Sequence, residues 1–598
     1  MTIDSAAVKV QSVTKVNVAK FAELEAAGCL VRAAGGHSLA LFIHGAKVYA
    51  LDNRCPHMGF PLDRGTLCDG VLTCHWHHAR FDLATGGTFD PWADDAQISP
   101  VEVIGGDIWV DVAPLRRPQA RQQGRLREGL ERNIPLVIAK STLALLDRSG
   151  DLVEPFRIGL EFGVKHRHGG WGQGLTMHAC LANMLPNLDT ADRPRALYHG
   201  LSAVAWESHG TAPRFPIRPL PDAAHDLVTL KRWFRQFVDV RDAEGAERCI
   251  ASAVRAGASP ADMTDILFAA ATDHRYIQTG HVADFANKAF EALDVAGWDE
   301  AELVLTSLAS AYANAERMEE SNAWRSPIDL VALCERALEA VPAACEAGRQ
   351  RRADGRALPD WRSLVPILLG DNPQSAVDAL VAALGDGLEA ADAAGAVAYA
   401  SALRIAQFHT GNEFDDWVSA MHSFSFANAI HQAIRRAPSP ELMRGVFDAA
   451  MSVYLNRFLN VPAARLPEAA DSGGQPDALL DDFGSLLNTR QQVNRAGELV
   501  AQYLSSGAAP ERLLAAMGHA LLREDRDFHS IQMLEAAVRQ YAFLRGTTEG
   551  GHVLVAAARY LAAHSPTVRA QGQTFQIASR LHRGERVFEE PSGSDAHS

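Results

Sequence analysis

The sequence lacks long apolar runs and strongly basic blocks, and it contains little cysteine. No stretch of 18 or more apolar residues occurs among the 598 residues, so we expect no transmembrane helix, and the mixed, polar N-terminus predicts no secretory signal. The 57 Lys and Arg residues are outnumbered by 72 Asp and Glu, and the net charge of −15 disfavours nucleic acid and anionic membranes as partners. Eight cysteines are too few for a disulfide scaffold of this length. These absences predict a soluble cytoplasmic protein.

Several motifs that identify a cofactor or a catalytic class are also absent. No G-x-G-x-x-G follows a predicted strand, so no NAD or flavin site is expected and the chain depends on an external reductant. Neither the G-x-S-x-G nucleophile elbow nor the H-E-x-x-H zinc motif occurs. The chemistry of this chain must therefore come from other patterns.

A break in composition divides the chain into two kinds of structure. Residues 1–113 contain short apolar runs between Gly, Asp and Asn turn signals, which predicts a small all-β domain. Residues 114–126 are rich in Pro, Gln and Arg, which is typical of an exposed linker. From residue 127 to 582, Ala- and Leu-rich segments with helical periodicity predict a large all-α region, followed by a polar tail at 583–598.

The β region carries a motif of two Cys–His pairs. Cys55-Pro-His57 is followed, after sixteen intervening residues, by Cys74-His-Trp-His77. Two thiolates on one iron and two neutral imidazoles on the other are the ligands of a mixed-ligand [2Fe–2S] centre. The alternative interpretation of the same four residues is a zinc site.

This motif resembles that of the Rieske ferredoxin family, and the resemblance covers roughly residues 10–113. Phe60 and Trp76 stand where high-potential respiratory members carry an extra disulfide, so the resemblance implies the lower-potential ferredoxin type. His78 departs from the family pattern, in which Gly is common, and we expect it to be tolerated or to crowd the cluster. The ring-hydroxylating oxygenases of this family need an H-x-x-x-x-H in an α+β catalytic domain. Because this chain has no H-x-x-x-x-H, we do not expect that catalytic domain here, and the electron of the cluster must be used elsewhere.

Two parts of the helical region have similar sequences, which predicts two pseudo-symmetric tandem halves at 127–355 and 356–582. His178 and His422 lie 244 residues apart in similar strings, and His281 and His529 lie 248 residues apart, each at the start of an amphipathic helix. A pseudo-twofold axis would bring these four histidines together. We therefore expect them to bind one metal in a helical bundle, with iron, copper, zinc and nickel all compatible with imidazole. The alternative for each is a hydrogen-bonded core histidine.

Lys288 lies two helical turns after His281 and is expected on the same face. A buried neutral Lys could react with CO2 to form a carbamate that binds the metal. The alternative is a Lys that reaches solvent or pairs with Asp284 or Glu291.

Three further residues are candidate general bases or orienting groups near the metal. They are Asp273, His274 and Asp525.

The four helical histidines and Lys288 resemble the questin-oxidase-like family of helical non-haem iron enzymes, over roughly residues 127–582. Members are associated with oxidative cleavage or Baeyer–Villiger-type oxygenation of aromatic polyketides, and some bind iron through four His and a carboxylated Lys. The resemblance implies a mononuclear iron here. The fused Rieske domain departs from that family and implies a built-in electron supply.

Three functional hypotheses follow. The first is an O2-dependent oxygenase in which a Rieske cluster, reduced by an external reductase or ferredoxin reductase, delivers electrons to a mononuclear iron that oxidises an aromatic small molecule. The second is a Rieske electron carrier with a helical module that docks a partner and holds no second metal. The third is a peroxidase- or catalase-like enzyme that uses the same metal.

Overall fold

The computed structural model describes residues 15–112, 119–221, 226–467, 475–585 and 587. These residues form two compact units, each considered by itself. The first unit contains the described residues up to Asp151 together with those from Gln573 onward, and the second unit is Leu152–Gly572.

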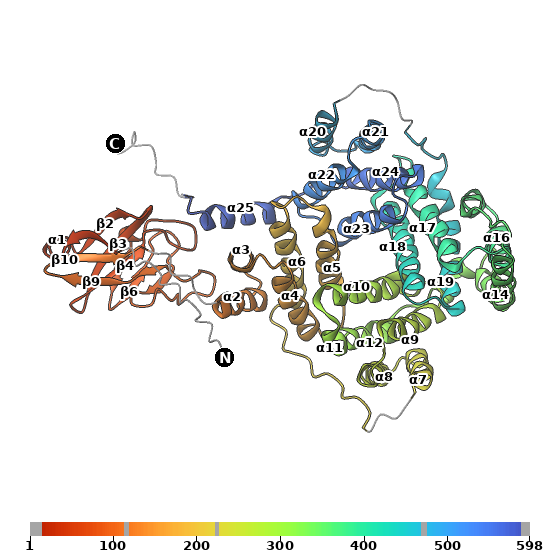
Figure 1. The fold of residues 1–598 in the computed structure, drawn as a ribbon, viewed down its shortest axis with the longest axis horizontal. Helices are drawn as coiled ribbons and strands as arrows, with labels where there is room; N and C mark the ends of the chain where they lie inside the picture. The colour runs from red at the N-terminus through yellow and green to blue at the C-terminus, as the bar shows by residue number, and fades with distance from the viewer. Residues whose placement is uncertain (1–14, 113–118, 222–225, 468–474, 586, 588–598) are drawn as a thin grey trace, which may run out of the picture. The chain divides into compact units, whose positions relative to one another are not determined.

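Three small antiparallel sheets form the β part of the first unit (Figure 1). The strand orders are β1-β10-β9, β2-β3-β4-β8 and β5-β6-β7, with a short helix α1 at Phe21–Ala27. The strands are β1 Lys15–Lys20, β2 Cys29–Ala34, β3 His37–His44, β4 Lys47–Asp52, β5 Thr66–Cys68, β6 Val71–Thr73, β7 Arg80–Asp82, β8 Ile98–Ser99, β9 Val101–Ile104 and β10 Asp107–Asp111. The predicted small β domain is confirmed.

Four of the hairpins in these sheets close through two-residue turns. Both turn residues have φ between 49° and 86°, the geometry that matches the twist of antiparallel strands and favours Gly, Asn and Asp. The turns are Gly35-Gly36, Gly45-Ala46, Asp69-Gly70 and Gly105-Gly106. These turns fix the register of the strands from which the cluster loops emerge.

Two helices follow the β part within the first unit, and the first of them corrects the predicted linker at 114–126. Helix α2 spans Gln119–Glu131 and α3 spans Pro135–Ser149, while α25 at Ala570–His582 begins at the boundary of the second unit. Residues 113–118 lie outside the described part. Arg and Gln are good helix formers, and Arg125 is buried with its guanidinium donating to the Ala93 carbonyl at 2.6 Å. That tertiary contact cannot be read from composition.

The second unit is built from helices, as the sequence predicts. The helices are α4 Val153–His166, α5 Gln173–Met184, α6 Arg193–Ser208, α7 Leu227–Asp239, α8 Ala243–Arg255, α9 Pro260–Asp273, α10 His281–Ala296, α11 Ala301–Thr306, α12 Ala309–Asn314, α13 Asn322–Arg325, α14 Leu330–Ala353, α15 Val365–Leu368, α16 Pro373–Gly385, α17 Ala390–Ala406, α18 Phe414–Arg436, α19 Met443–Leu455, α20 Pro476–Leu486, α21 Val493–Ser505, α22 Pro510–Leu522, α23 Phe528–Phe543 and α24 Thr548–Ala563. Within the described residues, no helix is both long and apolar enough to cross a membrane.

Four helices in the interior of the second unit position the candidate site. Helix α10 contacts α5 and α18, and α23 contacts the same two helices, so the four surround a common interior (Figure 1). Small and aromatic apolar residues fill most of this interior, including Ala286, Phe424 and Ala537. Polar side chains are buried among them, and a buried polar group is costly unless it is paired or bound. Their arrangement defines the site.

Candidate metal centres

Two loops of the first unit, which follow strands of different sheets, carry the Cys–His pairs. Cys55 and His57 lie in the loop after β4, and Cys74 and His77 lie in the turn between β6 and β7. Both cysteines are 1% exposed. The backbone N–H of Cys55 donates to the Phe60 carbonyl at 2.7 Å, which closes the first loop. The pairing predicted from the spacing is thus present at the tips of two short, hydrogen-bonded loops.

The two thiols lie within hydrogen-bonding reach of each other and of backbone donors. The N–H groups two and three residues after each cysteine point to its sulfur. The contact between the two thiols raises the pKa of Cys55 and lowers that of Cys74, so one of the pair readily becomes a thiolate. Amide donors directed at sulfur stabilise the thiolate form that binds iron.

The two imidazoles face each other across the same space. The rings of His57 and His77 lie 4.8 Å apart between centroids, at 84° to each other. His57 Nδ1 is buried and has no hydrogen-bond partner among the described residues. Burial lowers the pKa of His57 to about 4, with smaller contributions from His77 and Lys140, so the ring is neutral and its lone pair is free to bind a metal. Two thiols and two neutral imidazoles fit a [2Fe–2S] cluster of mixed ligation.

His78 adopts the left-handed backbone conformation, with φ of 63°. This conformation explains why Gly is common at this position in the family that the motif resembles, since L-residues avoid it. The side chain of His78 is exposed, as is that of the neighbouring ligand His77. The steric cost that the structure shows for His78 lies in the backbone, and crowding of the cluster stays a prediction.

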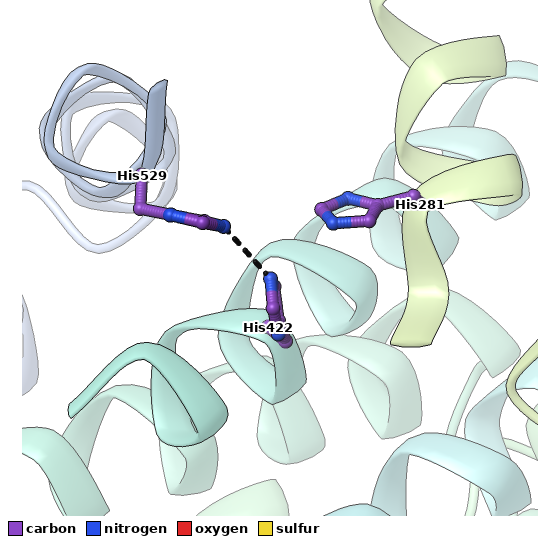
Figure 2. Close-up of side chains that lie close together, drawn as sticks. All are labelled: His281, His422 and His529. Carbon is purple, nitrogen blue, oxygen red and sulfur yellow. Dashed lines mark hydrogen bonds between the residues drawn. The ribbon is translucent and has the colours of Figure 1, made fainter. Parts of the chain in front are cut away.

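The second candidate centre is formed by three of the four predicted helical histidines. His281 is the first residue of α10, His422 lies on α18 and His529 is the second residue of α23. One ring nitrogen from each lies within 4.8 Å of the others, and Figure 2 shows the three rings directed toward a shared space. The Nε2 atoms of His422 and His529 are 3.0 Å apart. Two imidazoles that share a metal at about 2.1 Å place their nitrogens roughly 3.0–3.4 Å apart.

The three histidines lie among buried and aromatic side chains. Burial, together with the nearby His281 and His529, lowers the pKa of His422 to about 3. The ring of Phe285 stacks on His281 with centroids 5.1 Å apart, and Phe528 lies 5.5 Å from the same ring. A neutral His422 imidazole presents the lone pair that a metal ion requires.

Two carboxylates lie behind these rings. An Asp284 oxygen is 3.8 Å from His281 Nδ1, and an Asp527 oxygen is 3.5 Å from His529 Nδ1. In metal sites, a carboxylate behind a ligating His commonly orients the ring. Neither residue was predicted for this role, although each stands within three positions of its His in the sequence.

A run of left-handed backbone precedes His281. Tyr276, Gln278 and Thr279 have φ between 49° and 53°, and Gly280 has φ of 88°. A Cβ atom on Gly280 would lie 2.8 Å from Phe426 Cβ, so only Gly fits at the close approach to α18. Non-Gly residues in this conformation cost free energy and cluster at functional sites, and here they set the start of the helix that presents His281.

His178, the fourth predicted metal ligand, does not join the group, which corrects the four-His prediction. Its Nε2 atom lies 2.9 Å from the Phe156 carbonyl, and its ring stacks on Phe156. Helix α5 does contact α10 and α23, but it directs Cys180 and Asn183 toward them instead. These residues lie roughly 140–200° around the helix from His178, a rotation that the spacing of the histidines alone does not determine.

Lys288 also lies outside the group and pairs with two carboxylates. Its Nζ atom donates to Glu291 at 2.8 Å and to Glu535 of α23, and its side chain is 1% exposed. Burial lowers the pKa of Lys288, but the two carboxylates outweigh burial and hold the pKa above its ordinary value. Because carbamate formation needs a neutral amine, this ammonium corrects the carboxylated-Lys prediction. The pairing with Glu291 was one of the alternatives.

The three candidate general bases have structural partners. Asp273 pairs with Arg235 and Arg444, and His274 Nδ1 lies 2.7 Å from a Glu319 oxygen. Asp525 accepts the backbone N–H groups of the first two residues at the start of α25. None of the three belongs to the group of converging histidines, because each side chain is committed to an ion pair or to a helix terminus.

Comparison with known proteins assigns the first of the two centres. The model of the Rieske [2Fe-2S] domain family matches residues 14–98. The ferredoxin component of the p-cumate 2,3-dioxygenase system of Pseudomonas putida is 36% identical over 84 residues, which are 14% of this chain and 71% of that protein. The 3-phenylpropionate/cinnamic acid dioxygenase ferredoxin subunit of Escherichia coli strain K12 is 38% identical over 76 residues, 12% of this chain and 72% of that subunit.

Among solved structures, the chain is similar to the ferredoxin of carbazole 1,9a-dioxygenase from Nocardioides aromaticivorans IC177, at 30% identity and a TM-score of 0.16. The match covers 17% of this chain and 98% of that ferredoxin. The residues matched by the family model contain both Cys–His pairs and end before α2 begins. By its N-terminal domain, this chain belongs to the Rieske [2Fe–2S] family.

Proposed function

We propose that this chain is an oxidoreductase in which the Rieske domain supplies electrons to a mononuclear iron held by His281, His422 and His529. The proposal extends to the oxidation of an aromatic small molecule with O2. The observation that carries it is the convergence of three imidazoles from three helices that are far apart in the sequence. A Rieske cluster performs no substrate chemistry alone, so a second redox centre in the same chain gives its electron a destination.

Each residue of the two centres has a role in this proposal. Cys55 and Cys74 hold one iron of the cluster, and His57 and His77 hold the other. Iron bound by the three helical histidines supplies the capacity to react with O2. The protein places the Asp527 carboxylate beside His529, keeps His422 neutral by burial, and packs Phe285 and Phe528 against His281.

We also propose that the helical region arose by duplication. In this duplication, helices α4 to α10 of the first half correspond one by one to helices α17 to α23 of the second half. His281 and His529 then stand at the starts of the corresponding helices α10 and α23. The proposed halves are 127–355 and 356–582. His178 and His422 occupy the corresponding helices α5 and α18, but only His422 reaches the metal-binding group. Duplication followed by divergence would leave a three-His site of this kind.

The proposed partners follow from the absence of a nucleotide-binding motif and from the relatives. An external reductase must reduce the cluster, because no NAD or flavin motif is found in the sequence. Two relatives of the Rieske domain are ferredoxins of dioxygenase systems for p-cumate and for 3-phenylpropionate or cinnamic acid. Their names support an aromatic substrate for this chain.

A second function is favoured by a specific observation. The relatives are named as ferredoxin components, which suits an electron carrier whose helical unit docks a partner protein. In that function the three histidines hold no metal. The two functions differ in the metal content of the purified chain.

The test is iron per chain on anaerobically purified protein, with EPR of the dithionite-reduced sample. We expect about three irons, two in the cluster and one beyond it. His422→Ala should lose the additional iron and keep the Rieske signal. His178→Ala is the matched control, because it removes a buried helical His outside the group and should retain both. About two irons, with no other metal in the wild-type chain, would support the electron carrier and refute the oxygenase.

A further inference from the structure

Helices α2 and α3 hold the loops around the cluster site through cationic side chains. Arg121 pairs with Asp95 at 2.6 Å, and Arg125 donates to the carbonyls of Pro91 and Ala93. These contacts fix the loop from Pro91 to Asp95, whose Trp92 ring lies 4.7 Å from His57. The family match ends at residue 98, so both helices are additions to the Rieske domain.

Lys140 of α3 makes the contact closest to the cluster ligands. Its Nζ atom donates to the carbonyl of Pro56, the residue between Cys55 and His57. The side chain is 14% exposed, and an Asp94 carboxylate oxygen lies 3.8 Å from Nζ. The ammonium is therefore a charge in direct contact with the ligand loop. Its charge also contributes to lowering the pKa of His57.

Asp94 lies near a second cation as well as Lys140. A second Asp94 oxygen lies 3.6 Å from Arg125 Nε, so one carboxylate is shared between two cations. A cavity of about 450 Å³ borders this region and is lined by Cys55, Pro56 and Lys140. Solvent in the cavity screens distant charges more than it screens the direct contact between Lys140 and Pro56. The direct contact of the ammonium with the Pro56 carbonyl is therefore the charge interaction that solvent weakens least.

We propose that Lys140 raises the reduction potential of the Rieske cluster and so acts as an electrostatic positioning residue. Reduction transfers one electron from the reductant to the cluster, with no bond broken, and adds one negative charge beside Lys140. The ammonium therefore stabilises the reduced cluster more than it stabilises the oxidised cluster. Charge and hydrogen bonding near the ligands are established determinants of cluster potential. This inference does not depend on the proposed helical iron site.

The test is a mediated dithionite titration of the full-length holoprotein, followed by the EPR of the reduced cluster. Lys140→Met should lower the equilibrium constant for reduction at least threefold, which corresponds to about 28 mV for one electron. Lys140→Gln keeps a donor for the Pro56 carbonyl without the charge and should show the same direction, whereas Lys140→Arg should stay near wild type. Arg132→Met is the matched control, since Arg132 is an exposed cation in the connection between α2 and α3.

Asp94→Asn provides an independent measurement if the Lys140 variants fail to hold the cluster. Removal of this carboxylate leaves Lys140 less neutralised, so the potential should rise. The proposal is overturned if Lys140→Met with an intact cluster titrates at the wild-type potential, or if Arg132→Met shifts the potential as far. An unchanged or lower potential in Asp94→Asn also overturns it.

Discussion

An Asp527 carboxylate oxygen lies 3.5 Å from Nδ1 of His529, the residue two positions later at the start of α23. The same carboxylate caps the helix by accepting the Ser530 N–H. Burial raises the pKa of Asp527, but hydrogen bonds from His529 and Ser530 bring it down to about 2. Asp527 is therefore an anion that both starts the helix and faces the back of a candidate metal ligand.

The first prediction concerns metal affinity. Asp527→Asn should weaken metal binding at the three-His site by about 10–100-fold, because it removes the charge that orients His529. Asn is an equally good helix cap, so α23 should remain folded. The measurement is competition with a chelator, read out by metal analysis and EPR. Asp525→Asn is the control and should leave the affinity unchanged. Equal affinities in Asp527→Asn and wild type would remove Asp527 from the site.

The second prediction concerns Lys288, which joins α10 to α23 through two buried carboxylates. Lys288→Met should lower the free energy of unfolding by about 3–5 kcal/mol, because it leaves Glu291 and Glu535 without their shared cation. Arg539 lies 3.2 Å from Glu535 and compensates only in part. Chemical denaturation followed by circular dichroism measures the loss.

Lys165→Met is the control for the Lys288 prediction. Lys165 forms a half-exposed ion pair with Glu161 one turn away, so its removal should cost about 0–1 kcal/mol. A loss at Lys288 no larger than that at Lys165 would mean that Lys288 does not stabilise the interior of the bundle.

The Rieske site could be predicted from the sequence because its ligands are local. Cys55 and His57 are two residues apart, and the turn between two short strands brings Cys74 and His77 opposite them. Spacing alone therefore determines which side chains meet. The linker prediction failed for the opposite reason, since α2 is held by Arg121 and Arg125 against a distant loop.

The helical site could be predicted only in part. The similar strings in the sequence predicted His281 and His529 at helix starts, and the structure brings these two residues together with His422. The sequence could not show the rotation of α5 about its axis, which turns His178 toward Phe156. Nor could it show that Glu535, 247 residues from Lys288, provides a counter-charge. Asp527 had a local signal, an acidic helix cap two residues before a predicted ligand.

The third prediction concerns the backbone at His78. His78→Gly should raise the stability of the cluster-bound domain by about 1 kcal/mol, because Gly adopts a φ of 63° without the steric cost that an L-residue bears. The Rieske EPR signal should be unchanged, since His78 is not one of the four residues that hold the cluster in this proposal. Thermal loss of the visible cluster absorption measures the effect.

His75→Gly is the control for His78, because His75 lies in the same turn but bonds Thr66 Oγ1 through Nε2 at 2.5 Å. This substitution should lower the midpoint of cluster loss. A fall in the midpoint for His78→Gly as well would show that the His78 side chain has a stabilising role that outweighs the backbone cost.

The fourth prediction is a pH dependence that arises at Asp90 in the Rieske domain. Hydrogen bonds from Arg80, both from its backbone N–H and from its guanidinium at 2.8 Å, hold the pKa of Asp90 below its ordinary value. A carboxylate with a lowered pKa in the folded state stabilises that state above the unfolded pKa of about 3.9. The stabilisation is lost as the pH falls from that value through the folded-state pKa.

Asp90→Asn should therefore destabilise the domain by about 1–2 kcal/mol near pH 7, a modest value because the Arg80 side chain is 55% exposed. The difference from wild type should begin to shrink as the pH falls below the unfolded pKa of about 3.9, and it should vanish only below the folded-state pKa, where both chains carry an uncharged group at this position. Thermal unfolding scans from pH 7 to pH 3.5 measure it, and Asp69→Asn, in an exposed hairpin turn that suits Asn, controls for the loss of one charge. A difference that stays constant across this range would show that the Asp90 charge is not the source of the stabilisation.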